Sequence, residues 1–266
     1  MKRIGFIGVG NMGGAMAKAC AKVNEAQVWI YDTNQNAYSE FEGCKGIECA
    51  KNLEELVAAC DYIVMSIKPQ YYEVVVGQIQ RNVRSEQIII TVAPSFTLED
   101  MRNLLGESVK LIRTMPNTPA LIGQGVTAYC YDENRIEEEE LKDFITYFKS
   151  FGSLIKVDEK LMPAVVATTG SSPAYAYLFI EAMTDAAVSF GMPRAMAYQM
   201  ASMAIKGSAE MVLQTGKHPG ELKDAVTSPG GTTIKAVLAM EESGFRNSVI
   251  KAMEACYQQV IDMSKH

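Results

Sequence analysis

The chain has 266 residues, of which 48% are hydrophobic and 21% charged, and these fractions exclude a disordered or collagen-like protein. The formal net charge is −6 and no cluster of Lys and Arg occurs. Nucleic acid and anionic membranes are therefore not expected as partners, because binding to them requires a basic surface.

The first half of the chain alternates short β-branched runs with amphipathic stretches. Strands are predicted at Arg3–Gly8, Gln27–Asp32, Asp61–Lys68, Gln87–Ala93, Lys110–Met115, Val126–Tyr131 and Ser153–Val157. Helical patterns fall between most of them, as at Asn52–Ala59 and Arg135–Phe151. Strands separated by helices favour parallel βαβ units, so residues 1–157 are predicted to form an α/β, doubly wound sheet of the Rossmann type.

The first predicted strand runs into a glycine-rich loop that opens a helix rich in Ala and Met. The loop is Gly8-Val9-Gly10-Asn11-Met12-Gly13. In this spacing one glycine permits the tight turn, the next lets the backbone approach a pyrophosphate, and the third lets the helix pack on the strand. With Asp32 about twenty residues further on, the context matches a dinucleotide-binding fingerprint.

Asp32 bears on which cofactor binds. An acid at this position accepts hydrogen bonds from the ribose 2′-hydroxyl of NAD and repels the 2′-phosphate of NADP. No basic residue occurs at positions 33–36. Asp32 therefore favours NADH, although Thr33 and Asn34 can donate to a phosphate. Asp32 is equally compatible with a turn residue that faces away from the cofactor.

Two later strand ends are expected to share the cofactor edge of the sheet. Ligands of open α/β sheets lie at the carboxyl ends of the strands. The predicted strand ends are Ser66-Ile67-Lys68-Pro69 and Val92-Ala93-Pro94. Lys68 is either a charge near the phosphates or ribose or an ordinary strand-end lysine.

From about Asp158 onward the strand patterns end, and residues 158–266 are predicted to be helical. The helices are placed at Pro173–Phe190, Pro193–Gln214, Thr232–Glu242 and Phe245–Ser264, and Pro173, Pro193 and Pro219 are assigned to first helical positions. The stretch PAYAYLFIEAMTDAAVSFGM is apolar on nearly every face. We expect a second subunit to cover it, because a domain of about a hundred residues has little interior. A central helix of a self-contained bundle is the alternative.

A second glycine loop, TSPGGTT at residues 227–233, precedes one of these helices. The unsatisfied N–H groups of a helix N-terminus attract an anion, and Gly230 and Gly231 leave the backbone open to it. Thr232 and Thr233 add hydroxyl donors. The loop is predicted to hold a small carboxylic acid, and a capped turn between helices is the alternative.

The chemistry that fits both loops is hydride transfer to an electrophilic carbon beside an anionic handle. Reduction of a ketone needs a proton donor, usually His or Lys, and the chain has only His218 and the terminal His266. A substrate that is already a protonated imine reduces that demand.

The six cysteines are scattered without CxxC pairs. Their usage is typical of reduced thiols in a cytoplasmic protein, and they form no complete metal-ligand set. The apolar run that follows Met1-Lys2-Arg3 is interpreted as a strand and not as a signal peptide. No stretch approaches the roughly 18 apolar residues of a membrane span.

Several motifs together resemble the pyrroline-5-carboxylate reductase family. They are FIGVGNMGGAMA, IKPQ, RTMPNTPALIGQG, GSSPAYAYLFIEAM, HPGELKD and SPGGTTIKAVLAMEESGFR. The resemblance implies reduction of 1-pyrroline-5-carboxylate to L-proline by a nicotinamide cofactor, commonly NADPH, as the last step of proline synthesis. It also implies a Rossmann domain joined to a helical dimerisation domain, in a dimer that can assemble further, commonly to a decamer.

The resemblance also assigns residues to two sites. Cofactor contacts are implied for Ile7, Gly8, Val9, Gly10, Asn11, Met12, Asn34, Asn52, Ser66, Ile67, Lys68, Pro69, Val92, Ala93 and Pro94, and the glycine spacing adds Gly13. Substrate contacts are implied for Ser228, Gly230, Gly231, Thr232 and Thr233. Thr233 stands where the family places a hydroxyl near the imine nitrogen. Since a threonine hydroxyl is a very weak acid, we expect a hydrogen-bonding or relay role there, with the proton coming from water or the iminium.

Two positions depart from the family pattern, and the sequence has two alternative interpretations. Asp32 stands where many relatives have a small or uncharged residue, and Ala225 where some have Asn. The opening motif also resembles β-hydroxyacid dehydrogenases, but Lys206 lacks the asparagines that follow their catalytic lysine. A sensor that binds NAD(P) without turnover has no need of the second glycine loop.

Overall fold

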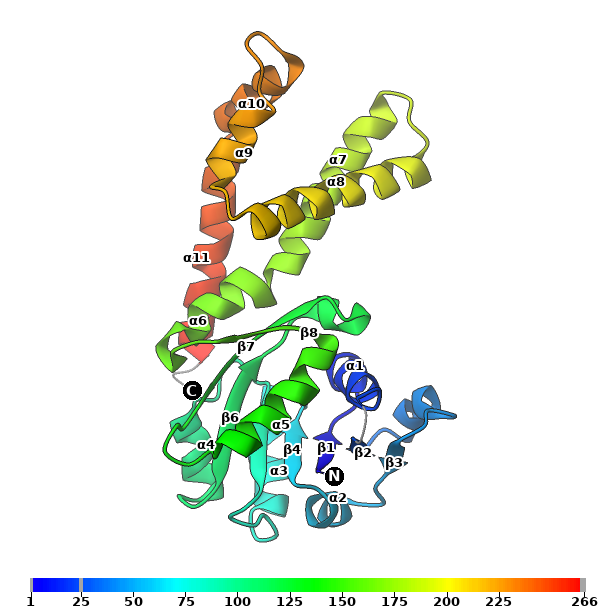
Figure 1. The fold of residues 1–266 in the computed structure, drawn as a ribbon, viewed down its shortest axis with the longest axis vertical. Helices are drawn as coiled ribbons and strands as arrows, with labels where there is room; N and C mark the ends of the chain where they lie inside the picture. Colours follow the sequence, from blue (N-terminus) through cyan, green and yellow to red (C-terminus); the bar gives the residue numbers. More distant parts are fainter. Residues whose placement is uncertain (1, 24–25, 264–266) are drawn as a thin grey trace. The chain divides into compact units, whose positions relative to one another are not determined.

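A computed structural model of the protein describes residues 2–23 and 26–263. The chain divides into two compact units. One holds the residues up to Ser171 and those from Cys256 onward, and the other is Ser172–Ala255. The first unit is an α/β sheet structure, and the second consists of helices (Figure 1).

The first unit is built on one eight-stranded sheet with strand order β3-β2-β1-β4-β5-β6-β7-β8. The strands are β1 (Arg3–Ile7), β2 (Gln27–Tyr31), β3 (Ile47–Cys49), β4 (Tyr62–Met65), β5 (Ile88–Thr91), β6 (Lys110–Met115), β7 (Gly125–Tyr131) and β8 (Gly152–Lys156). Every neighbouring pair is parallel except β6 and β7. The chain order reverses between β1 and β4, which is where ligands of doubly wound sheets bind.

Helices cover both faces of this sheet. One buried cluster joins the strands to α1 (Asn11–Cys20) and α5 (Glu138–Phe148). The other joins them to α2 (Leu53–Ala59), α3 (Tyr72–Ile79) and α4 (Leu98–Leu105). Because both faces are covered, the central strands are continuously apolar, as in the fully buried YIVM of β4.

The predicted strands are all present, but β4 and β5 are shorter than the predicted Asp61–Lys68 and Gln87–Ala93, and three further features differ. The three-residue strand β3 was not predicted. The predicted helix Arg135–Phe151 begins later, as α5 at Glu138. The expectation of parallel units is wrong for β7, which is antiparallel to β6. Only the short 3₁₀ helix η3 (Thr118–Ile122) joins these two strands, and a parallel crossover needs a dozen or more residues.

A helical connection follows the last strand. It consists of η5 (Glu159–Leu161), α6 (Met162–Val165) and the π-helix η6 (Val166–Gly170). The predicted limit at residue 157 coincides with the end of the strands, since β8 ends at Lys156 and none follows as far as residue 263. As a domain limit it stays a prediction.

The second unit contains α7 (Ser172–Ser189), α8 (Arg194–Thr215), α9 (Pro219–Ala225), α10 (Thr232–Glu242) and the first part of α11 (Phe245–Met263). Neither Pro173, the second residue of α7, nor Pro193, the N-cap of α8, is the first helical residue as predicted, whereas Pro219 does begin α9. The short helix α9 was absent from the predicted set.

Large apolar side chains stand exposed on this unit when one chain is considered. Phe190 is 85% exposed and Leu213 78%, and Tyr177, Leu178 and Met203 are each 60% exposed or more. This exposure agrees with the expectation that another subunit covers these helices. No helix in the described part of the chain has the length and apolar content needed to cross a membrane.

Helix α1 packs directly against the turn that follows β1. A Cβ built on Gly13 would lie 2.1 Å from the Gly8 carbonyl oxygen and 2.5 Å from Ser66 Oγ. Both neighbours are held by their own strands, so Gly13 allows the close approach of helix and sheet.

We predict that Gly13→Ala lowers the free energy of unfolding by about 1–3 kcal/mol, because the added methyl group forces α1 away from the sheet. Gly10→Ala is the matched control, since a Cβ at that position meets no atom within 4 Å. Chemical denaturation of both variants tests this. Equal stability of the two would show that the close contact of Gly13 is unimportant.

Candidate functional site

The register of the sheet brings the predicted cofactor residues to one edge. Ile7, the last residue of β1, pairs with Tyr31 of β2 and Met65 of β4, and Met65 pairs with Thr91 of β5. The residues that follow these four strand ends are Gly8, Asp32, Ser66 and Val92. The strand ends on both sides of the β1–β4 reversal therefore meet here, as the sequence predicts.

The first glycine loop has the form its spacing predicts. Gly8 takes a φ of +89°, a conformation that side-chain-bearing residues rarely adopt. Gly10 is the exposed N-cap of α1, and no side chain caps it. The first amides of α1 lack partners within the helix, and the space above Gly10 is open. A phosphate-sized anion fits this cradle.

Asp32 is hydrogen-bonded to the glycine loop. Its carboxylate accepts one bond from the Val9 amide and another from the Asn34 amide, both 2.8 Å long. The second bond forms a local turn, which is the alternative role that the sequence allows for Asp32. Each carboxylate oxygen keeps acceptor capacity for a further donor, so the turn and a ribose contact are compatible. The contact to ribose stays a prediction.

Ser66 supports the same loop from the other side. Its hydroxyl lies 2.6 Å from the Gly8 carbonyl oxygen and donates a hydrogen bond to it. Lys68 is exposed, caps the short 3₁₀ helix η2 (Pro69–Tyr71), and forms no ion pair with any described residue. Its ammonium group is therefore free to meet an anion.

A buried tyrosine connects the carboxyl ends of β4 and β5. It is Tyr72, the first residue of α3. Its hydroxyl donates to the Met65 carbonyl at 2.7 Å and lies 2.9 Å from Thr91 Oγ1 and 3.3 Å from the Val92 amide. Burial raises the pKa of Tyr72 to about 12, so the phenol keeps its proton at neutral pH.

A buried arginine holds the far end of the loop after β5. Arg113 of β6 donates to the Pro94 carbonyl at 2.8 Å and to Glu159 Oε1 at 2.9 Å. The same carboxylate oxygen accepts a bond from the Leu98 amide. With 4% of its surface exposed, Arg113 has its charge matched by Glu159 and its position fixed.

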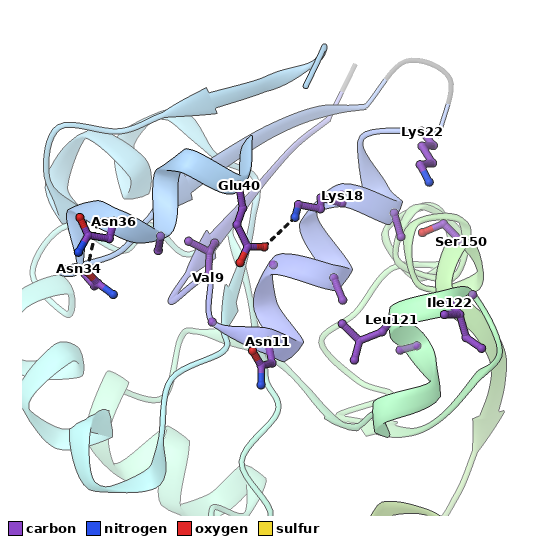
Figure 2. Close-up of a pocket in the computed structure, with 17 residues that line it drawn as sticks. Val9, Asn11, Lys18, Lys22, Asn34, Asn36, Glu40, Leu121, Ile122 and Ser150 are labelled. Carbon is purple, nitrogen blue, oxygen red and sulfur yellow. Dashed lines mark hydrogen bonds and ion pairs between the residues drawn. The ribbon is translucent and has the colours of Figure 1, made fainter. Parts of the chain in front are cut away.

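A groove runs along the exposed side of α1, beside the glycine loop (Figure 2). Its volume is about 660 Å³, and it brings together four predicted cofactor residues: Val9, Gly10, Asn11 and Asn34. Lys18 reaches across it to Glu40 at 2.9 Å, while Leu121 and Ile122 of η3 form the opposite side. The side chains from η1 (Gln35–Phe41) and η3 were not predicted as part of this region.

The remaining predicted cofactor residues have local structural roles. Asn34 caps η1 and accepts a bond from Asn36, and Asn52 caps α2 and accepts a bond from Glu55. Ile7 is buried in the core with 2% exposure, so only its backbone is available to a ligand. Met12, in α1, is partly buried and packs against the hydrophobic core. Nothing in these contacts tests their predicted roles in cofactor binding.

The second glycine loop, Ser228 to Thr233, lies in the second unit. Gly230 has a φ of +69°, and the Gly231 amide donates to the Ser228 carbonyl at 3.0 Å. Gly231 is the N-cap of α10, and no side chain caps that helix. Thr232 and Thr233 begin α10 and are exposed, as is Ser228. The loop thus presents first-turn amides and hydroxyls to solvent, as an anion site requires.

Sequence reasoning missed Tyr72, Thr91 and Arg113. All three are buried polar residues inside otherwise apolar elements, and that pattern was the available signal. Their partners lie on other strands, so the sequence alone could not identify them. Within residues 2–23 and 26–263, no three His, Cys, Asp or Glu residues gather as metal ligands.

Sequence comparison relates both parts of the chain to known families. A family model described as pyrroline-5-carboxylate reductase dimerisation matches residues 159–263. A second, described as NADP oxidoreductase coenzyme F420-dependent, matches residues 3–95.

Whole-chain relatives carry the same name. The pyrroline-5-carboxylate reductase of Escherichia coli K12 is 42% identical, over 99% of each chain. That of Pisum sativum is 35% identical, over 98% of this chain and 96% of its own. The crystal structure of Plasmodium falciparum pyrroline carboxylate reductase with NADP bound has a TM-score of 0.89 at 30% identity, covering 99% of this chain and 98% of that one. Since these matches span nearly the whole chain, the protein belongs to the pyrroline-5-carboxylate reductase family.

Proposed function

We propose that this protein reduces 1-pyrroline-5-carboxylate to L-proline with a reduced nicotinamide cofactor, the last step of proline synthesis. The observation that carries the proposal is the presence in one chain of two uncapped, glycine-lined helix N-termini, one at α1 and one at α10. The first suits the phosphates of a dinucleotide and the second a small carboxylate. The family to which the chain belongs indicates the substrate, a small imine that carries a carboxylate and accepts a hydride.

The residues proposed to hold the cofactor lie along the edge described above. The amides of residues 10–12 receive the pyrophosphate, while Asp32 and Asn34 lie on the ribose side and the loops 66–69 and 92–94 on the other. The bound cofactor supplies a hydride to the imine carbon. The protein holds these groups rigidly through Ser66, Tyr72 and Arg113.

The loop from Ser228 to Thr233 is proposed to bind the substrate carboxylate. Backbone amides at the start of α10 and the hydroxyls of Thr232 and Thr233 supply the donors. Thr233 is proposed to hydrogen-bond near the imine nitrogen or to relay a proton there, with the proton coming from water or the iminium. A cationic iminium arrives with the proton it needs, so the chain requires no strong general acid.

We also infer that NADH is preferred. Asp32 places a negative charge at the end of β2, and residues 33–36 supply no compensating cation. Lys18, in the groove nearby, is already paired with Glu40. Thr33 and Asn34 can donate hydrogen bonds to a 2′-phosphate, but no cation at positions 33–36 would offset its repulsion by the Asp32 carboxylate. Self-association as a dimer through α7 and α8 fits the exposed apolar side chains of those helices.

The central prediction is that the purified protein oxidises NADH or NADPH when 1-pyrroline-5-carboxylate is added and releases proline. Loss of near-ultraviolet absorbance by the reduced cofactor measures the reaction, and chromatography identifies the product. If neither cofactor is consumed at any substrate concentration, the reductase function is wrong.

A second prediction concerns the carboxylate loop. A Cβ on Gly231 would lie 2.5 Å from Ser228 Oγ, so Gly231→Val should displace the loop and raise the KM for substrate by about tenfold or more. The Kd for the cofactor should stay unchanged. Gly77→Val, where the space is open, is the control. Equal weakening of cofactor and substrate binding would contradict a dedicated carboxylate site.

A third prediction concerns Asp32. We expect Asp32→Asn to shift the ratio of kcat/KM for NADPH over NADH upward by about tenfold, because it removes the charge that repels the 2′-phosphate. Asp61→Asn is the matched control, since that carboxylate accepts the Arg3 amide at the other end of β1. An unchanged ratio would show that Asp32 does not face the ribose.

A further inference from the structure

The hydroxyl of Tyr72 bridges two strand ends that adjoin proposed cofactor residues. On the β4 side it donates to the carbonyl of Met65, the residue before Ser66. On the β5 side it contacts Thr91 Oγ1 and the amide of Val92. One buried atom thus connects the ends of two adjacent parallel strands, in addition to the ladder between them.

The number of available hydrogen atoms determines which group donates in each hydrogen bond of this hydroxyl. A tyrosine hydroxyl has one hydrogen, and the 2.7 Å bond to Met65 uses it. Thr91 Oγ1 must therefore donate to the tyrosine oxygen, and it accepts in turn from the Ala93 amide at 3.3 Å. The amides of Val92 and Ala93 are both held through this bridge. Two of the three residues in the proposed cofactor loop 92–94 thus have their backbone fixed by it.

The surroundings of Tyr72 make the bridge rigid. The side chain is fully buried, and its ring stacks on Phe96 with the centroids 4.6 Å apart. Thr114 of β6 donates to the carbonyl of Thr91 at 2.9 Å. The end of β5 is therefore fixed from two sides.

Burial alone does not distinguish Tyr72 from other tyrosines of the core. Tyr62 is also buried, with 1% exposure, and its hydroxyl donates to the carbonyl of Glu140 at 3.0 Å. Its bond lies at the start of β4, away from the proposed cofactor edge. The two residues differ in what their hydroxyls hold, and Tyr62 is therefore a matched control.

We propose that Tyr72 is a positioning residue for hydride transfer, whose hydroxyl sets the spacing of the loops 66–69 and 92–94 around the bound cofactor. This role rests on the proposed reductase function. It acts through the backbone of these loops, and Tyr72 itself is too deeply buried to touch a ligand.

The strand order predicts which kinetic constant responds. In the order β2-β1-β4-β5, Asp32 and the glycine loop lie on one side of the bridge. The bond from the Val9 amide to Asp32 does not involve Tyr72, and the ladder between β1 and β4 still holds Met65, and with it Ser66, beside the glycine loop. The phosphate-binding part is therefore expected to stay intact when the bridge is cut. The loops after β4 and β5 then lose their fixed spacing. The affinity for the cofactor should therefore change little, while the nicotinamide carbon that carries the hydride is positioned less precisely.

The test compares Tyr72→Phe with Thr91→Val and Tyr62→Phe in the full chain. For the first two we expect kcat to fall about tenfold while the Kd for NADH changes less than about threefold. The primary isotope effect with NADH deuterated at the transferred position should rise. The double variant should lose no more than the stronger single variant, because both remove the same bridge. Tyr62→Phe should lower the melting temperature alone.

A cofactor-free measurement accompanies the kinetics. Amide hydrogen exchange of Val92 and Ala93 should become at least about tenfold faster in Tyr72→Phe, and stay unchanged in Tyr62→Phe. The fluorescence of the single tryptophan, Trp29, can be used to follow unfolding of each variant.

The outcomes separate this proposal from the reductase function. If Tyr72→Phe only lowers the melting temperature, with kcat and the isotope effect unchanged, the positioning role is wrong. A weakened Kd with unchanged kcat also overturns it. If the unaltered protein reduces no 1-pyrroline-5-carboxylate, the reductase function itself fails and the positioning role fails with it, whatever the exchange data show. Should Tyr72→Phe not fold, Thr91→Val decides by the same criteria.

Discussion

A glycine-rich loop that binds phosphate through its backbone has few side chains of its own to fix its conformation. Residues from neighbouring strands must therefore fix it. In this protein Asp32 accepts the amide of Val9 from one side, and Ser66 donates to the carbonyl of Gly8 from the other. Gly13 then lets α1 press against the same turn. These contacts fix the direction of the first amides of α1, on which the proposed cofactor site depends.

The second glycine loop is built differently. Like α1, helix α10 begins without a capping side chain, but its loop is held by a bond within itself, from the Gly231 amide to the Ser228 carbonyl, and its threonines are exposed. An anion at this point would replace water and not a protein group. We therefore interpret the first loop as a preformed cradle, and the second as one that the substrate completes by supplying the missing acceptor.

Hydrophobic period and glycine spacing predict the elements that carry both loops. The limits of β6 and α10 match the predicted limits, because a uniform pattern ends at clear turn residues there. Strand β3 has only three residues, too few for a period to be recognised, and the reversal at β7 depends on the length of the connection. Asp32 could be placed near the loop, but its bond to the Val9 amide needs the register between β1 and β2.

The helical unit carries a consequence for the life of the chain in the cell. Phe190 and Leu213 are 85% and 78% exposed in a single chain. Chaperones and proteases recognise exposed apolar surface of this kind. The lifetime of a newly made chain should therefore depend on how quickly it associates with a second copy. The rate of pairing scales with the square of the concentration of single chains. When less protein is made, a smaller fraction of the chains pairs, so the cellular amount of the protein should fall more steeply than its rate of synthesis.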